Sequence, residues 1–180
     1  MIALTQATSA GEISAVRDLF QNYAAWLRVD LGFQGFAAEL TALPGAHAPP
    51  GGRLFLVLAE SVPAACGALR PVDEGVCEMK RLFVRPEHQG KGLGRMLARR
   101  LIAEARSIGY STMLLDTLPQ MHRAIRLYES LGFARRPPYY QTPIEGTIFL
   151  ELNLARVEAL QTNVPGQPPV SPAPPGGVSH

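Results

Sequence analysis

Apolar residues follow two different spacings along the chain, and their alternation predicts an α/β (α+β) architecture. Short apolar or alternating runs, of the length of buried or half-buried strands, occur at residues 2–7, 53–60, 64–72, 76–84, 112–116, 133–136 and 146–154. Apolar residues at helical spacing occur at residues 13–27, 36–43, 93–108 and 120–131. The expected order of elements is therefore β-α-α-β-β-β-α-β-α-β-β.

The connections between these elements predict how the sheet is built. Short turns join the three strands between residues 53 and 84, which favours an antiparallel meander. A helix then separates the third of these strands from the next one, and a crossover of this kind makes its two strands parallel.

Ser9 and Glu12 form a capping-box pattern at the start of the first helix. Residues 117–120 are expected to open the last helix, with Pro119 in its first turn.

A glycine-rich turn follows the third strand of the meander. Gly90, Gly92 and Gly94 allow a tight backbone curve, and backbone N–H groups at a helix N-terminus attract anions such as phosphate. A P-loop needs Ser or Thr directly after its Gly-Lys, and a dinucleotide fingerprint starting at Gly90 needs a glycine where Arg95 stands. The pattern that is met is Gln-x-x-Gly-x-Gly, beginning at Gln89. A surface loop without a ligand is the alternative interpretation.

A second motif occurs one strand later, on the last predicted helix. Residues 124–133 end in Leu-Tyr-x-x-Leu-Gly-Phe. The glycine turn followed by this motif resembles the GNAT superfamily of acyl-CoA-dependent N-acetyltransferases. The resemblance covers roughly residues 1–154 and implies the GNAT fold, a mixed and mostly antiparallel sheet with helices on both faces. It also implies acetyl-CoA as co-substrate and no metal.

The resemblance implies a binding site for acetyl-CoA on the strand end, the glycine turn and the wall opposite. The strand end would pair its backbone with the pantetheine amides, and amides of the turn would hold the pyrophosphate. The implied residues are Leu82, Phe83, Val84, Gln89, Gly90, Lys91, Gly92, Leu93, Gly94, Arg95, Thr117 and Met121. Family members often carry Asn near the position of Met121, so this chain departs from the pattern there.

The same resemblance implies an acid and a base. An alkylammonium acceptor must lose a proton before it attacks, and Glu78 stands eleven positions before Gln89, where some acetyltransferases carry a glutamate base. Tyr128 matches the family's tyrosine that protonates the leaving thiolate. A backbone N–H on strand 82–84, exposed by a bulge, would hold the oxyanion. The alternatives are a carboxylate that only pairs with Lys80 or Arg81, and a tyrosine that only packs and hydrogen-bonds the sulfur.

We therefore predict an N-acetyltransferase that moves an acetyl group to a primary amine by direct attack in a ternary complex. The amine would belong to a small metabolite, an amino acid-like compound or a protein. Residues expected to face it are Phe33, Arg81, Tyr139 and Tyr140. A non-catalytic module that binds CoA esters as a sensor or regulatory partner is the alternative function. Trp26 is assigned to the core or to an interface.

Composition narrows the class of protein further. The 180 residues and net charge of +2 suit one soluble domain and argue against a dedicated nucleic-acid binder. Cys66 and Cys77 would not face each other in the expected hairpin, so neither a disulfide nor a zinc site is predicted. Without a long apolar run or a secretory signal, the prediction is a cytoplasmic protein that does not bind membranes. The sequence leaves a homodimer open.

Residues 156–180 differ in composition from the rest of the chain, because they are rich in Pro and Gly and carry few large apolar side chains. Such a segment buries too little surface to offset the entropy lost on ordering. We expect a disordered or peripheral tail after a single acetyltransferase domain at residues 1–155.

Overall fold

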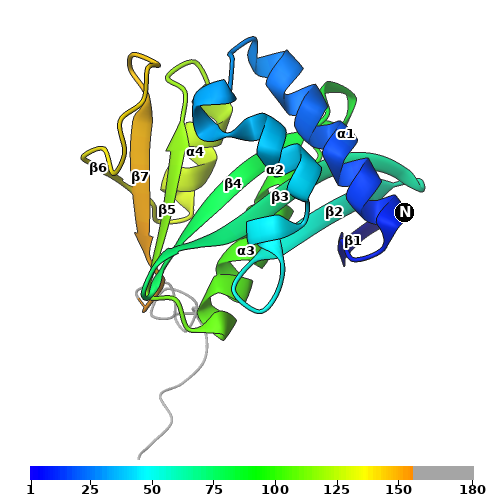
Figure 1. Cartoon of the computed structure of the whole chain (residues 1–180), viewed down its shortest axis with the longest axis horizontal. Coiled ribbons are helices and arrows are strands. Elements are labelled where there is room, and N and C mark those ends of the chain that lie inside the picture. Colours follow the sequence, from blue (N-terminus) through cyan, green and yellow to red (C-terminus); the bar gives the residue numbers. More distant parts are fainter. Residues whose placement is uncertain (156–180) are drawn as a thin grey trace, which may run out of the picture.

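The computed structural model of the protein describes residues 1–155 (Figure 1). Its strands are β1 (Ile2–Gln6), β2 (Arg53–Ala59), β3 (Val62–Asp73), β4 (Val76–Val84), β5 (Thr112–Thr117), β6 (Ala134–Arg136) and β7 (Ile148–Asn153). Its helices are α1 (Ala10–Leu27), α2 (Phe36–Ala42), α3 (Leu93–Ile108) and α4 (His122–Ser130), with short 3-10 helices η1 (Gly32–Gln34), η2 (Gly45–His47) and η3 (Pro86–His88). The order of strands and α-helices is the predicted one. The expectation for residues 156–180 lies outside the described part of the chain.

Within the described residues the strands form one sheet in the order β1-β2-β3-β4-β5-β7-β6. Strands β1 to β4 are antiparallel neighbours, and β7 runs antiparallel to both β5 and β6. The one parallel pair in this sheet is β4 with β5, which confirms the predicted crossover through α3. That pairing joins Val76–Glu78 to Thr112–Leu114 only, and beyond it the two strands part (Figure 1).

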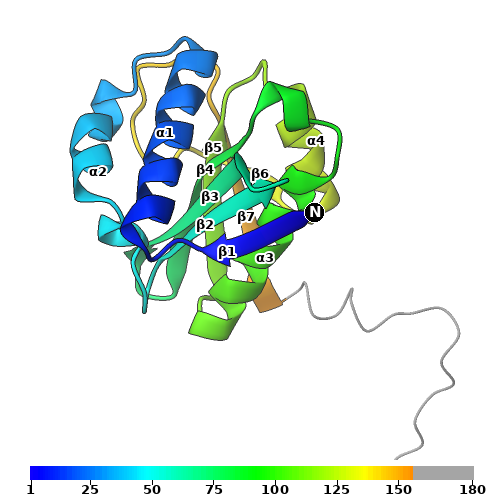
Figure 2. The same cartoon turned by 90° about the vertical axis from the view of Figure 1, so that its right-hand side faces the viewer.

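Helices cover both faces of the sheet, with α1 and α2 on one face and α3 and α4 on the other (Figure 2). The alternation of side chains along β2 produces the two cores. Leu54 and Leu56 pack in the cluster that contains Phe20 of α1, while Phe55 and Val57 pack in the cluster built on α3. Of the helices in residues 1–155, none combines the length and the apolar character that crossing a bilayer requires.

The start of α4 differs from the sequence-based expectation. The helix begins at His122, and Met121 precedes it without a side-chain cap. Pro119 lies in a turn that is closed by a hydrogen bond from Met121 N to Leu118 O at 3.0 Å. Because this turn takes up the residues after β5, the prediction that Pro119 stands in the first turn of the helix is wrong.

The two cysteines are free and buried. In the β3–β4 hairpin Cys66 lies opposite Phe83, whereas Cys77 lies opposite Pro71. The two thiols therefore sit at different levels of the hairpin, and the prediction that they form no disulfide is confirmed.

Strand β4 carries a bulge shortly before its end. Cys66 pairs with Phe83 and Ala68 pairs with Lys80, so β4 has one more residue than β3 across this interval. Arg81 lies in the extra stretch with a φ of 56°, in the left-handed region that residues with side chains rarely adopt. A bulge near the end of this strand agrees with the sequence analysis, and its role in binding an oxyanion stays a prediction.

The side chain of Arg81 is fastened to the segment between α1 and β2. Its Nε and Nη2 donate to Glu39 Oε2 at 3.1 and 2.7 Å, and its Nη1 donates to Gln34 Oε1 at 2.8 Å. The guanidinium carbon lies 5.0 Å from the ring centroid of Phe36. Glu39 Oε1 also lies 2.8 Å from His47 Nε2. Elements η1, α2 and η2 are therefore tied to the β4 bulge through one arginine.

Glu39 is the negative charge at the centre of this cluster. Burial by itself would raise the pKa of Glu39, but the hydrogen bond from His47 and the charge and hydrogen bonds of Arg81 outweigh it and lower the pKa to about 2. This value lies below the ordinary 4.5 of the unfolded chain. The stability that the ionised carboxylate contributes is therefore fully present above about pH 5 and is lost as the pH falls toward 2.

Replacing Glu39 should destabilise the protein in a pH-dependent way. We expect Glu39→Gln to lower the free energy of unfolding at pH 7 by about 1.5–3 kcal/mol, because it removes charged hydrogen bonds from the buried Arg81. The difference from the wild-type protein should shrink between about pH 5 and pH 3, as the wild-type carboxylate takes up protons on unfolding. Urea unfolding at several pH values measures both the loss of stability at pH 7 and its dependence on pH.

Glu129→Gln provides the matched control, because Glu129 is 47% exposed and lies 3.7 Å from Arg135. Exposed pairs of this kind contribute little to stability, so this variant should unfold like the wild type. If Glu39→Gln lowered the free energy of unfolding equally at pH 7 and at pH 3, the lowered pKa assigned to Glu39 would be contradicted.

Candidate active site

A groove with a volume of about 630 Å³ runs between the end of β4, the start of α3 and α4. Nine of the residues predicted to bind the donor line it: Leu82, Phe83, Val84, Gln89, Gly90, Gly92, Leu93, Gly94 and Met121. Its other lining residues come mainly from the turn before α4 and from α4 itself. Lys91 in the glycine turn and Arg95 in the first turn of α3 do not line the groove, and Thr117 lines a neighbouring pocket.

The glycine turn gives this groove a wall of backbone. Gly90 and Gly92 have φ values of 78° and 79°, which a residue with a side chain would adopt only with strain. Gly92 is also the N-cap of α3, and no side chain caps the free N–H groups at that helix end. Gln89 Nε2 donates to Val84 O at 3.2 Å and fixes the turn to β4. An uncapped helix N-terminus of this kind attracts a phosphate group.

One wall of the groove was not found by sequence reasoning. Trp26 of α1 lines the groove, is 43% exposed and lies 6.0 Å from the ring of Phe83. Tyr23, one helical turn earlier, contacts Phe83 too, with ring centroids 5.5 Å apart. The spacing of the two aromatic residues puts them on one face of α1. Only the packing of α1 across the end of β4 shows that this face borders the groove.

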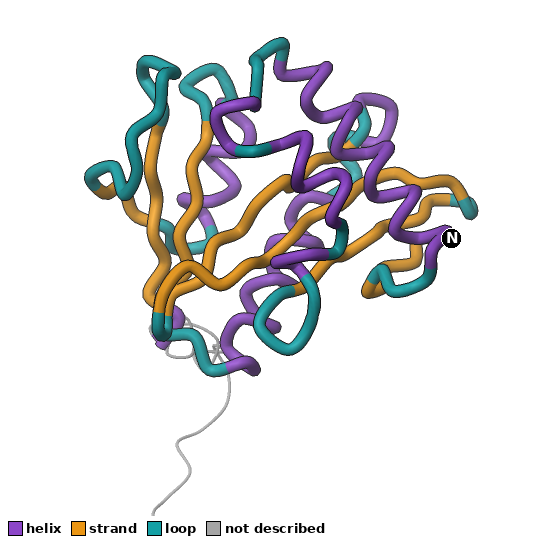
Figure 3. Tube along the Cα trace, viewed as in Figure 1, coloured by secondary structure: helices purple, strands orange, loops and turns teal. Residues whose placement is uncertain are grey.

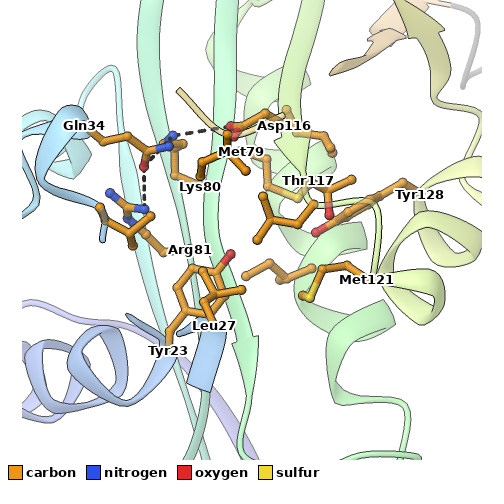
Figure 4. A pocket seen from close by; sticks show the side chains of 15 residues that line it. Tyr23, Leu27, Gln34, Met79, Lys80, Arg81, Asp116, Thr117, Met121 and Tyr128 are labelled. Carbon is orange, nitrogen blue, oxygen red and sulfur yellow. Dashed lines mark hydrogen bonds and ion pairs between the residues drawn. The ribbon is translucent and has the colours of Figure 1, made fainter. Parts of the chain in front are cut away.

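A small pocket of about 50 Å³, here called the junction, continues from the groove into the gap between β4 and β5. It shares Leu82, Met121 and Tyr128 with the groove. Figure 4 shows Met121, Thr117 and Tyr128 on one side of it and the side chains of Gln34, Lys80 and Arg81 on the other.

A second large cavity of about 530 Å³, here called the hollow, lies on the far side of the junction. Gln34, Lys80 and Arg81 line both the junction and the hollow. Phe33, Arg81 and Tyr140, three of the residues predicted to face the acceptor, line the hollow, and their role toward an acceptor stays a prediction. Figure 3 shows that the loop after α1 and the loop from β6 to β7 rise at the same end of the sheet. Groove, junction and hollow are therefore neighbouring cavities, with the junction sharing lining residues with each of the other two.

Glu78 lies beside this series without lining any of the three cavities. Its side chain is 1% exposed, and Arg70 Nε and Nη2 donate to Oε1 at 2.8 and 2.7 Å. Tyr139 donates a short hydrogen bond to Oε2, and Lys80 Nζ lies 4.0 Å from the same atom. The main partner of Glu78 is thus Arg70, and Arg81 is bound to Glu39 instead. Tyr139, predicted to face the acceptor, is turned toward Glu78.

Asp116 is the carboxylate that lines the junction. Its Oδ2 accepts a hydrogen bond from Tyr140 at 2.9 Å, and its Oδ1 lies 3.5 Å from Lys80 Nζ. Burial, followed by the negative charge of the neighbouring carboxylates, raises the pKa of Tyr139 and of Tyr140. Both phenols therefore stay protonated and donate to Glu78 and Asp116.

Tyr128 is 7% exposed and lines both the groove and the junction. Burial raises its pKa far above the ordinary value, so the phenol keeps its proton at neutral pH and can act as a hydrogen-bond donor. Burial likewise raises the pKa of the Cys77 thiol to about 12, which leaves too little thiolate for a nucleophile. Among residues 1–155, no three His, Cys, Asp or Glu side chains are grouped to hold a metal ion.

The position of two further residues could have been predicted from the sequence. A hairpin centred near Glu74 sets Arg70 opposite Glu78, and the structure shows this pair. Lys80 lies two positions after Glu78, so strand alternation puts both side chains on one face of β4. Sequence reasoning considered Lys80 only as a partner of Glu78 and did not place it at the junction.

Comparison with known proteins identifies the family to which this chain is related. Residues 15–133 match the Acetyltransferase (GNAT) family. An uncharacterised N-acetyltransferase of Schizosaccharomyces pombe is 39% identical over 140 residues, which are 77% of this chain and 86% of that protein. The L-methionine sulfoximine/L-methionine sulfone acetyltransferase of Salmonella typhimurium is 39% identical over 77 residues, 43% of this chain and 45% of that protein.

A Salmonella typhimurium protein solved with its cofactor acetyl-CoA is similar over 85% of this chain and 94% of its own, with 26% identity and a TM-score of 0.60. Together with the family match over most of residues 1–155, this likeness establishes the fold and the class of enzyme. The chain belongs to the GNAT family of acetyltransferases.

Proposed function

We propose that this enzyme transfers the acetyl group of acetyl-CoA to the primary amine of a small, amino acid-like acceptor, by direct attack in a ternary complex. The observation that carries the proposal is the series of groove, junction and hollow. It lets a donor and an acceptor enter from opposite sides and meet at the opening between β4 and β5.

The groove supports acetyl-CoA as the donor. The uncapped start of α3 would bind the pyrophosphate, and the open edge of β4 at residues 82–84 would pair with pantetheine. Trp26 and Phe83 supply apolar surface between these two regions. The thioester would then lie at the junction, where Tyr128 borders both cavities.

The hollow supports a small acceptor that carries a carboxylate as well as an amine. Arg70 lines it with a side chain 43% exposed, and a guanidinium that reaches solvent can bind a carboxylate. Phe33 and Tyr140 offer apolar surface to a side chain. A relative of this chain acetylates derivatives of methionine, which are compounds of this class. A concave cavity also suits a small molecule better than a protein segment.

We propose Glu78 as the base and Tyr128 as the acid of this reaction. Because Glu78 lines none of the three cavities, a water molecule would carry the proton from the amine to it. Asp116 lines the junction directly and is the competing proton acceptor. Tyr128 stands where the thiolate would leave.

Donor binding should be visible in the fluorescence of Trp26, the one tryptophan of the chain. We expect acetyl-CoA to change its emission saturably and to raise the melting temperature, because a ligand that binds only the folded state stabilises it. Gly92→Asp should abolish both effects, since a carboxylate would face the pyrophosphate. Gly92→Asn has nearly the same size without the charge and tolerates positive φ, so it should keep most of the binding. Absence of any effect of millimolar acetyl-CoA on the wild type would refute the donor site.

The acid and the base should differ in their pH dependence. Glu78→Gln cannot accept a proton, so kcat/KM should fall by roughly 10²–10⁴, and the loss should shrink as rising pH deprotonates the acceptor. Tyr128→Phe should slow turnover without weakening acetyl-CoA binding, and its defect should persist at high pH. Asp116→Asn is the comparison variant, and the Trp26 signal of each variant reports whether the donor site is intact.

Two outcomes would count against these roles. Near wild-type rates of Glu78→Gln and Tyr128→Phe from about pH 6 to 9 would exclude both assignments. Saturable binding of acetyl-CoA without CoA release in the presence of any amine tested would favour the alternative function, a sensor of CoA esters.

A further inference from the structure

The chain contains only two lysines, Lys80 and Lys91, although Lys and Arg together number seventeen. Lysine and arginine differ in whether the side chain can lose its proton. An arginine guanidinium stays protonated under all ordinary conditions, whereas a lysine amine can lose its proton and become a nucleophile. Lys91 is exposed in the glycine turn, and Lys80 lies at the junction. The position of Lys80 therefore puts a primary amine where the acetyl group is to be transferred.

The Lys80 amine is close to three acceptors and tightly bound to none of them. Nζ lies 3.5 Å from Gln34 Oε1, 3.5 Å from Asp116 Oδ1 and 4.0 Å from Glu78 Oε2. These distances exceed those of ordinary N–H···O hydrogen bonds, about 2.7–3.2 Å. The side chain is nevertheless only 8% exposed, so reagents in solution have little access to it. A group bound in the groove and junction reaches it more directly.

The arrangement of the cavities determines which bound groups can reach the Lys80 amine. Lys80 lines the junction, which shares Leu82, Met121 and Tyr128 with the donor groove. Lys80 lines the hollow as well, so the amine of an acceptor that reaches the thioester from the hollow would come close to Lys80. Figure 4 shows the side chain of Lys80 at the junction. When the hollow is empty, its amine would be the primary amine beside the reactive end of a bound donor.

We propose that the enzyme acetylates its own Lys80 when acetyl-CoA is bound and no acceptor occupies the hollow. The proposal rests on the proposed function, because it uses the same donor and the same junction. Asp116 or Glu78 first takes a proton from the ammonium group. The neutral Nζ then attacks the thioester carbon, a C–N bond forms, the C–S bond breaks and CoA leaves as a thiolate. The second amine proton is lost, and the thiolate is protonated to free CoA.

The product is an amide, which does not pass its acetyl group on to an amine. Acetylation of Lys80 also removes the positive charge that lies between Glu78 and Asp116. The added group would take up space in a junction of only about 50 Å³. The modification is therefore an end state of the site and not an intermediate of turnover.

The test uses the full-length protein, acetyl-CoA with an isotopically labelled acetyl group and no added amine. Intact-mass measurement followed by peptide mapping should find one labelled acetyl group on Lys80. The labelling rate should saturate with acetyl-CoA concentration, with the half-saturation value given by the Trp26 fluorescence titration. Lys80→Arg should remove this label. A small acetyl thioester without the nucleotide should label exposed Lys91 and spare Lys80.

Three results would overturn the proposal. Binding of acetyl-CoA and CoA release with an amine, but no label on Lys80, would refute self-acetylation and leave the proposed function standing. Label that rises linearly with acetyl-CoA and is equal on Lys80 and Lys91 would show reaction in solution. Absence of a saturable Trp26 response would refute the donor site, and with it both proposals.

Discussion

Strands β4 and β5 are paired over only three residues each, and the site depends on their separation beyond that point. Glu78 and Leu114 form the last pair, so the backbone of β4 after Glu78 has no neighbour on the β5 side. The bulge at Arg81 then turns the strand end further. This opening gives access to a strand edge in the middle of a sheet, where side chains would otherwise fill the space.

The charges around the opening are arranged in pairs that hold its walls. Arg81 joins the bulge to α2 through Glu39, Arg70 joins β3 to Glu78, and Lys80 lies near Asp116 of β5. The Arg81–Glu39 and Lys80–Asp116 contacts connect elements that no backbone pairing joins at this level. The Arg70–Glu78 contact adds a side-chain link to strands β3 and β4, which are paired at these two residues. Each buried charge in these pairs has an oppositely charged partner before any acceptor binds. This pairing lowers the free-energy cost of keeping the charges buried.

Much of the fold and of the proposed donor site follows from local sequence, whereas the proposed acceptor side does not. The glycine turn and the helix after it have signatures that do not depend on distant contacts, and the structure places Gly90, Gly92 and Gly94 on the groove. Trp26 reaches the same groove only through the packing of α1 on Phe83. Tyr139 and Tyr140 are adjacent in sequence but serve different carboxylates, a division that requires the loop conformation. Pro119 misled the helix prediction because a turn after β5 precedes α4.

The most direct test of the account is the initial velocity of CoA release with acetyl-CoA and an amino acid-like acceptor both varied. A groove and a hollow that meet at one junction predict a ternary complex. Double-reciprocal plots should then give lines that intersect, with labelled N-acetylated acceptor as the product. Parallel lines would show an acetyl-enzyme intermediate, and no release of CoA with any acceptor would show that the junction does not transfer acetyl groups. Either result would contradict the account.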